Sequence, residues 1–319
     1  MPAGLEFSEE TIMINLLSRR YYFFALSLLI ILPGLISLFI WKPPLAIDFT
    51  GGSLLEVRFE SGKAIPPSQI VLLYNRLGVE DIQAQTTSVG SILARSSFLN
   101  DQTRAQIVTE MEKTFSDKVT VLRFDSVGPT IGREVTTRAG LAVAIAALAV
   151  IIYMTFAFRG VEHALRYGLC AIIAMVHDVG VVISLGAIGG HFWGWQIDSL
   201  YLTAVLTVIG FSVQDKIVVF DRIRENSSIH RRLPFETLVN HSIIQTLQRS
   251  INTQLMTVEF MLLALALFGG VTLREFATIL LVGLFSGTYS SIFIAAPILV
   301  AWENKEWRNW FQPKPKSAT

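Results

Sequence analysis

Charged side chains are scarce in this sequence. Asp, Glu, Lys and Arg make up 16% of its 319 residues, whereas soluble domains usually contain about 25%. Hydrophobic residues reach 52%, and many of them are gathered into runs of about 20 residues, the length that crosses a bilayer as a helix. The low charge argues against an ordinary soluble protein, and the apolar runs predict an integral membrane protein.

Several chemical signatures are also missing. Cys170 is the only cysteine, so no intrachain disulfide is expected. The sequence contains no G-x-x-x-x-G-K-[ST] phosphate loop, no H-E-x-x-H zinc pair and no G-x-S-x-G nucleophile elbow. We therefore predict that the chain is not an enzyme and binds neither a metal nor another cofactor.

Six apolar runs predict six transmembrane helices. Lys and Arg gather before the first run and after the second, fourth and sixth, and such loops stay in the cytoplasm. Both termini are therefore predicted to be cytoplasmic, and the polar segment between the first two runs is predicted to lie outside. The runs cover residues 21–41, 139–158, 167–188, 199–220, 251–268 and 276–302.

The predicted domains follow from these runs. Residues 1–41 form the cytoplasmic N-terminus and first helix, 42–137 an extracytoplasmic domain, 138–302 helices two to six, and 303–319 a cytoplasmic tail. Within the outside segment, apolar alternation, Pro and Gly predict the order strand, helix, strand, strand, helix, strand. This order favours a small ferredoxin-like α+β domain.

The fourth run contains charged residues within TVIGFSVQDKIVVFDRIREN. A charge at the bilayer centre costs roughly 2.5–3.5 kcal/mol, so Asp215 and Lys216 indicate function. Asp215 and Asp221 are about 9 Å apart along a helix axis, too far to share a proton. We interpret Asp215 as a carboxyl group that exchanges a proton, and Asp221, Arg222 and Arg224 as a cluster at the cytoplasmic edge.

Two further runs carry ionisable groups at depth. His177 and Asp178 lie halfway along the third run. His177 fits either a packed, hydrogen-bonded ring or a relay member, whereas Asp178 requires a partner or a water path. Arg249 precedes a polar helical face in the fifth run; it either extends to the interface or faces the acids.

Small residues recur at four-residue spacing in the sixth run. Gly283, Gly287 and Ser291 lie on one helical face. Such residues allow helix backbones to approach closely. Helix packing is the favoured interpretation, and a direct path for protons is the alternative.

Short strings along almost the whole chain carry a family resemblance. They are AIDFTGG after the first run, SVGPTIGRE before the second, VHDVGV in the third, and FSVQD with VVFDRIREN in the fourth. QTLQRSINT follows before the fifth, and FGGVTLREFA and GTYSSIFIA lie around the sixth. In content and order these strings resemble the SecF family of bacterial protein-export membrane proteins, partners of SecD and relatives of the RND exporters.

The resemblance implies an RND-type membrane unit and a subunit of the SecD/SecF accessory complex of the Sec translocase. Such a subunit promotes polypeptide export driven by the proton-motive force, with protons as the coupling ion. The implied partners are a SecD-like subunit, the SecYEG channel, unfolded exported polypeptides and the lipid bilayer, with no nucleic acid. The implied location is the bacterial cytoplasmic (inner) membrane, as a multi-pass protein.

Family motifs also imply site residues. The residues that match are Asp215, Asp178 and Arg249 for a proton relay, and Asp48, Gly51 and Gly52 for the motif after the first helix. Two positions depart from the family pattern: Lys216 replaces a small residue, and Glu259 stands in an apolar run. We hypothesise that Lys216 and Glu259 form an ion pair between the fourth and fifth helices. Impaired proton coupling is the other explanation.

Two other functions fit the same residues. Half of an RND-type exporter of small molecules or lipids would also need intramembrane acids and an outside domain. A non-conducting membrane scaffold would hold partner proteins without moving protons, and Lys216 favours it because a nearby cation keeps a carboxyl group ionised.

Overall fold

The structure is a computed structural model that describes residues 15–41, 45–62, 65–87, 90–159, 164–254 and 260–306. The chain divides into two compact units, each described by itself. The helical unit falls within Met1–Lys42, Ala147–Trp193 and Thr203–Thr319. The sheet unit comprises Pro43–Ala146 and Gly194–Leu202.

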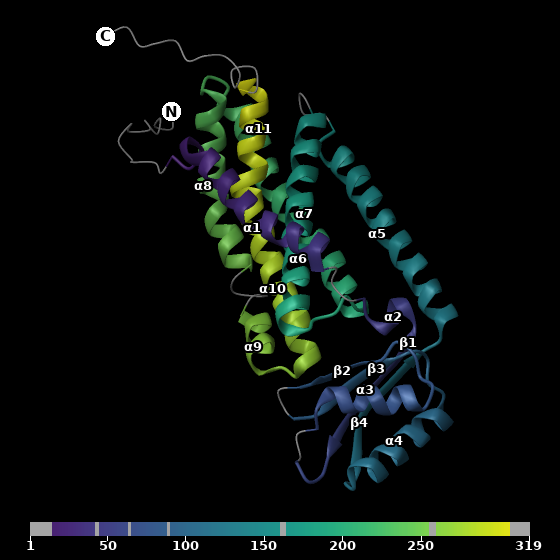
Figure 1. The fold of residues 1–319 in the computed structure, drawn as a ribbon. Helices are drawn as coiled ribbons and strands as arrows, with labels where there is room; N and C mark the ends of the chain where they lie inside the picture. The colour runs from purple at the N-terminus through teal and green to yellow at the C-terminus, as the bar shows by residue number, and fades with distance from the viewer. Residues whose placement is uncertain are drawn as a thin grey trace. The chain divides into compact units, whose positions relative to one another are not determined.

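Long helices make up most of the chain (Figure 1). Five of those described are long and apolar enough to cross a membrane. The predicted run 251–268 falls on the end of α8, on α9 and on residues 255–259 outside the described ranges, so a sixth span stays a prediction. Apart from three helices that are described below with the sheet, the described helices are η1 (Leu17–Arg19), α1 (Arg20–Trp41), α5 (Pro129–Ala157), α6 (Ala164–Trp193), α7 (Ser199–Ile229), α8 (Phe235–Gln254), α9 (Phe260–Phe268), α10 (Val271–Ser290), the π-helical turn η3 (Ser291–Ala295) and α11 (Ala296–Glu303).

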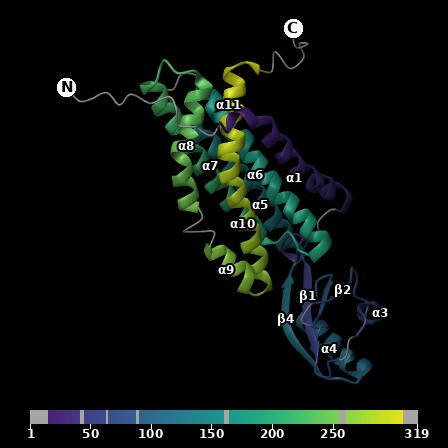
Figure 2. The ribbon, with the colours of Figure 1, turned by 90° about the vertical axis from the view of Figure 1, so that its left-hand side faces the viewer.

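Small residues set the helix packing in this unit. A Cβ atom added to Gly34 of α1 would lie 1.9 Å from the Ser184 Cβ of α6. One added to Gly283 of α10 would lie 2.3 Å from a methyl carbon of Val208 in α7. Both views show α10 running beside α6 and α8 (Figures 1 and 2). The glycines therefore permit helix approaches that a side chain would block.

The sheet unit contains four antiparallel strands in the order β2-β3-β1-β4. Its elements alternate along the chain as strand, helix, strand, strand, helix, strand after the short helix α2. The bounds are α2 (Ile47–Thr50), β1 (Gly52–Phe59), α3 (Pro67–Arg76), β2 (Gln83–Thr86), β3 (Ile92–Ser96), α4 (Asp101–Phe115) and β4 (Val119–Val127).

Local sequence explains where these helices begin. Pro67 opens α3, where its fixed φ suits a first helical position. The Asn100 side chain caps α4 by accepting a hydrogen bond from the Thr103 amide at 2.7 Å. One face of the sheet packs against α3 and α4 in a core that includes Leu55, Tyr74 and Met111.

The buried hydroxyl of Tyr74 has no hydrogen-bond partner among the described residues. The Tyr74 side chain is fully buried, and burial raises its pKa. An unsatisfied buried polar group costs about 1–3 kcal/mol. The hydroxyl therefore lowers the stability of a core that is otherwise apolar.

Tyr74→Phe is expected to raise the free energy of unfolding of the sheet unit by about 1 kcal/mol, because it removes only the unsatisfied hydroxyl. The control Tyr74→Ala opens a cavity and should lower it by about 3–5 kcal/mol. Protease resistance of the full-length protein on heating, read at sites within this unit, measures both changes. Destabilisation by Tyr74→Phe would contradict the assignment.

Candidate functional site

A buried ion pair joins α6 to α7. The Lys216 ammonium lies 2.7 Å from Asp178 Oδ2, and both side chains are 0% exposed. Removing two charges from water costs several kcal/mol per ion unless other hydrogen bonds satisfy them. The surroundings of the pair therefore decide whether it is stable.

Three serine hydroxyls surround the pair. Ser212 and Ser290 donate to Asp178 Oδ2 at 2.6 and 2.7 Å, and Ser286 donates to Oδ1 at 2.7 Å. Lys216 also donates to the Ser212 hydroxyl at 2.6 Å and the Ser290 hydroxyl at 2.9 Å. We call Asp178, Ser212, Lys216, Ser286 and Ser290 the polar cluster; all five are buried. Its charges are compensated by one another and by hydroxyl groups.

Helical spacing and small residues build the cluster. Ser212 and Lys216 are four apart on α7, and Ser286 and Ser290 are four apart on α10, so each pair shares a helix face. Gly287 lets α10 approach α7, since a Cβ there would lie 3.3 Å from the Ser212 Cα. The glycine thus brings the serines of α10 within reach of Asp178.

His177 lies beside the cluster. Its Nδ1 atom is 3.0 Å from Asp178 Oδ1, and its side chain is 11% exposed. The ring also stacks near Tyr289, with 6.2 Å between centroids. The contact fits the hydrogen-bonded interpretation of His177, and it also places an imidazole in direct reach of the carboxylate.

Asp215 occupies a different environment from its neighbour Lys216. Its half-buried carboxylate accepts a hydrogen bond from Thr288 of α10 at 3.0 Å. The Lys216 side chain is buried, and the carboxylate that its ammonium contacts is that of Asp178. Glu259 lies outside the described residues, so its pairing with Lys216 stays a prediction.

The remaining predicted residues of α7 and α8 lie apart from the polar cluster. Asp221 is exposed and pairs with Arg224 at 3.0 Å. Arg222 donates to Gln245 of α8 at 2.6 Å. Arg249 is exposed and makes no ion pair within the described part of the chain. The partners of Asp221 and Arg222 lie outside the polar cluster. Exposed ion pairs contribute only about 0–1 kcal/mol to stability.

The motif after α1 lies in the sheet unit. Asp48 of α2 contacts Ser199 at the start of α7. Gly51 and Gly52 have φ of +73° and +121°, a region that disfavours other L residues. Gly51 also lies against Pro129, whose Cα would be 2.8 Å from an added Cβ. The glycines are thus required by both backbone conformation and close contact.

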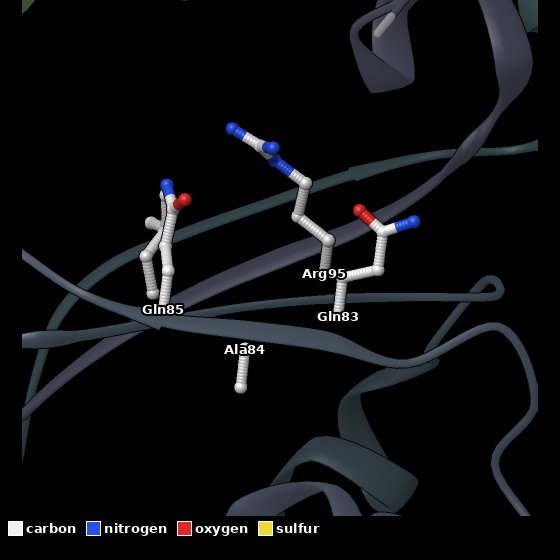
Figure 3. A pocket seen from close by; sticks show the side chains of 5 residues that line it. Gln83, Ala84, Gln85 and Arg95 are labelled. Carbon is white, nitrogen blue, oxygen red and sulfur yellow. The ribbon is translucent and has the colours of Figure 1, made fainter. Parts of the chain in front are cut away.

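Residues described in the sheet unit also line a smaller and a larger cavity. The smaller, about 140 Å³, is lined by Gln83, Ala84, Gln85, Leu93 and Arg95. Figure 3 shows the Gln83, Gln85 and Arg95 side chains on one side of the strands and Ala84 on the other. The larger, about 440 Å³, lies beside the glycine motif. Among the residues described, no group of His, Cys, Asp and Glu is arranged to hold a metal ion.

Sequence reasoning missed the three serines and the pairing of Asp178 with Lys216. The sequence did contain a signal for shared helix faces, because Ser212 and Lys216 are four positions apart, as are Ser286 and Ser290. Serine is also common wherever transmembrane helices pack closely. Spacing alone therefore did not separate a charge-binding serine from a packing serine.

The fold and the site together define a class of membrane protein. The chain is a multi-span helical membrane protein with a compensated ion pair buried between its apolar helices and a separate α+β unit. It matches the family "Protein export membrane protein SecD/SecF, C-terminal" over residues 106–305 and "SecD/SecF GG Motif" over residues 36–63. The chain belongs to this SecD/SecF family, which confirms the resemblance seen in the sequence.

Individual relatives agree with this family assignment. Protein translocase subunit SecF of Anaerolinea thermophila is 68% identical, over 96% of this chain and 100% of that protein. The SecF of Thermobaculum terrenum is 44% identical, over 96% and 99%. The crystal structure of SecDF, a translocon-associated membrane protein from Thermus thermophilus, matches with a TM-score of 0.78 and 33% identity, over 92% of this chain and 39% of that one. This chain therefore spans well under half of the SecDF protein.

Proposed function

We propose that this chain uses the proton-motive force to promote polypeptide export, as half of a complex with a SecD-like subunit at the SecYEG channel. The observation that carries this proposal is the fully buried pair of Asp178 and Lys216. Ionisable groups inside transmembrane helices face the protein interior and mark proton or ion pathways. The coupling ion is the proton, and the cargo is an unfolded polypeptide.

A SecD-like partner is supported by the relative in which both subunits form one chain. SecDF of Thermus thermophilus contains a segment similar to this chain in 39% of its length. The rest of that chain is therefore available for the SecD part. Because many transporters are built from two related helical halves, we propose that this chain supplies one half.

The finer architecture belongs to the same proposal. Sheet order β2-β3-β1-β4 with antiparallel pairs and two helices supports a ferredoxin-like domain. Apolar helix α9 supports a sixth span within run 251–268. The distribution of Lys and Arg supports cytoplasmic termini in the bacterial inner membrane, with the domain of residues 42–137 outside.

Charge balance suggests how a proton would move helices. With Asp178 ionised and Lys216 protonated, the polar cluster has no net charge. A proton added to Asp178 neutralises the carboxylate and leaves the Lys216 ammonium unpaired, which is costly in a buried site. Asp215 immediately precedes Lys216 in α7 and provides a second carboxylate. We propose that Lys216 then shifts toward Asp215, which changes how α7 packs on α6 and α10.

Asp215→Asn tests the proposal. We expect it to abolish proton-dependent stimulation of export, because an amide cannot carry the proton or compensate Lys216, while assembly with the SecD-like subunit is unchanged. Export into vesicles with and without an imposed proton gradient measures the stimulation. Asp221→Asn is the matched control, since Asp221 is an exposed acid on the same helix. Normal stimulation in Asp215→Asn would overturn the relay.

A non-conducting scaffold is the second candidate. It is favoured by the complete set of hydrogen bonds around Asp178 and Lys216, since a fully satisfied buried pair can fix helix packing without moving protons. The two candidates differ in whether the charges themselves are needed once the helices are packed.

A further inference from the structure

The first turn of α7 is held by a carboxylate from another element. Asp48 Oδ2 accepts hydrogen bonds from the Ser199 amide at 3.0 Å and the Ser199 hydroxyl at 2.6 Å. The two residues are 151 positions apart in sequence. The first amides of a helix have no partner within the helix, and their positive end favours an anion. Asp48 therefore meets both needs at once.

Asp198 caps the same turn from within the chain. Its Oδ1 atom accepts a hydrogen bond from the Tyr201 amide at 2.7 Å. Burial, and also the nearby charge of Asp48, raise the pKa of Asp198. Asp198 thus provides the ordinary N-cap, so Asp48 is not needed for α7 to begin at this position. Another role must account for the second carboxylate.

The short helix α2, which carries Asp48, is fixed on two sides. The Ala46 amide donates to the Ile197 carbonyl at 2.9 Å. The Thr136 hydroxyl of α5 donates to the Phe49 carbonyl at 2.9 Å. An added Cβ on Gly132 of α5 would lie 2.6 Å from the Gly51 nitrogen. These contacts leave α2 little freedom to move independently of the starts of α5 and α7.

The chain leaves α2 directly into the centre of the sheet. Gly51 and Gly52 follow α2, and Gly52 is the first residue of β1. Strand β1 pairs with both β3 and β4. A force on Asp48 therefore reaches a strand that is hydrogen-bonded on both edges, which resists bending more than an edge strand or a loop.

Helix α7 is continuous from Ser199 to Ile229 and also carries Asp215 and Lys216. Ser199 and Asp215 are sixteen positions apart, which corresponds to a distance of about 24 Å along the helix axis at 1.5 Å per residue. We propose that Asp48 is a positioning residue that fixes α2 to the first turn of α7, which belongs to the sheet unit, so that displacement of α7 by the proton step moves the outside domain. This inference rests on the proposed function and assigns a role to the aspartate of the GG motif.

The inference predicts that Asp48→Ala uncouples proton movement from export. In the full-length chain, reconstituted with its SecD-like partner, we expect proton-dependent stimulation of export to fall by about tenfold or more, because both hydrogen bonds to Ser199 are lost. Amide hydrogen exchange of residues 199–202 should rise by a similar factor, and assembly should be unchanged. Asp48→Asn should recover much of both signals, since an amide oxygen still accepts from Ser199.

Asp198→Asn is the matched control. Asn caps helices as well as Asp does, so this variant removes a neighbouring charge while Asp48 keeps its bonds to Ser199. Stimulation should stay within about twofold of the unmodified protein, less than the effect of losing one hydrogen bond. If Asp48→Ala fails to assemble, Ser199→Ala replaces it, because it removes the hydroxyl donor alone; severalfold weaker stimulation is then expected.

Each outcome separates the inference from the proposed function. If Asp215→Asn abolishes stimulation but Asp48→Ala and Ser199→Ala leave it unchanged, the tie is not needed for coupling and the inference is overturned. If Asp215→Asn also leaves stimulation unchanged, the proposed function fails, and the inference fails with it. Loss of stimulation in Asp48→Ala with recovery in Asp48→Asn supports the inference, because the recovery shows that coupling needs the hydrogen bonds to Ser199 and not the negative charge of Asp48.

Discussion

Removing one charge of the Asp178 and Lys216 pair should destabilise the protein far more than removing both. Asp178→Asn leaves the buried Lys216 ammonium without the carboxylate that it contacts, and Lys216→Gln leaves the buried Asp178 carboxylate without a cation in contact with it. Breaking a buried ion pair from one side costs about 3–5 kcal/mol, a large part of the 5–15 kcal/mol that is typical of folded proteins. Both single variants should therefore unfold at much lower temperature.

The double variant Asp178→Asn with Lys216→Gln should recover most of that loss. Its polar cluster carries no charge, and the two new amide groups can still form hydrogen bonds with Ser212, Ser286 and Ser290. Neutral replacements of a buried pair are often tolerated, so we expect stability within about 2 kcal/mol of the unmodified protein.

Thermal unfolding of the purified, detergent-solubilised protein measures these differences as a double-mutant cycle. The exposed pair of Asp221 and Arg224 is the control, with side chains 57% and 48% exposed. Its variants Asp221→Asn and Arg224→Gln should each change stability by less than about 1 kcal/mol. Additive losses in the buried pair would show that Asp178 and Lys216 are not coupled.

The same double variant distinguishes the two candidate functions. A scaffold needs only the packing of α6, α7 and α10, so a folded, uncharged cluster would still support export. A proton-driven subunit needs a group that gains and loses a proton, and the double variant lacks one at this position. Stable protein without proton-dependent stimulation therefore favours the relay, whereas retained stimulation favours a role confined to packing.

Much of the sheet unit could be predicted from sequence because its signals are local. Alternating apolar residues and the Pro at the start of α3 indicate strands and a helix start without reference to distant residues. Partner choice is different. Asp178 was expected to need a partner, yet the pairing with Lys216 depends on the rotation and depth of two helices, and a sequence period does not fix either.

The glycines show the same limit. Four-residue spacing indicated that Gly283 and Gly287 lie on a packing face, but it did not identify Val208 and Ser212 as the groups across the interface. Gly34, where an added Cβ would lie 1.9 Å from the Ser184 Cβ, has no such partner glycine in α1 and drew no prediction. A close helix contact depends on the surfaces of both helices, and a local sequence pattern describes the surface of only one of them.

Gly34→Ala is expected to disrupt the packing of α1 on α6. The added Cβ would lie 1.9 Å from the Ser184 Cβ and 2.4 Å from the Ser184 Cα. No rotamer change relieves a contact with backbone, so the helices must separate. Overpacking typically costs about 1–3 kcal/mol and occasionally more; here we expect at least about 3 kcal/mol. Separation also weakens the Ser184 hydroxyl's 3.2 Å hydrogen bond to the Ile31 carbonyl.

Gly140→Ala is the matched control, because an added Cβ there meets nothing within 4 Å. Alanine favours a helix by about 1 kcal/mol over glycine, so this variant should be neutral or slightly stabilising under the same thermal unfolding. Ser184→Gly combined with Gly34→Ala removes the side-chain part of the clash but not the backbone part, so it should recover only a fraction of the lost stability. Full recovery would locate the clash in the Ser184 side chain alone, and no loss in Gly34→Ala would mean that α1 and α6 do not approach this closely.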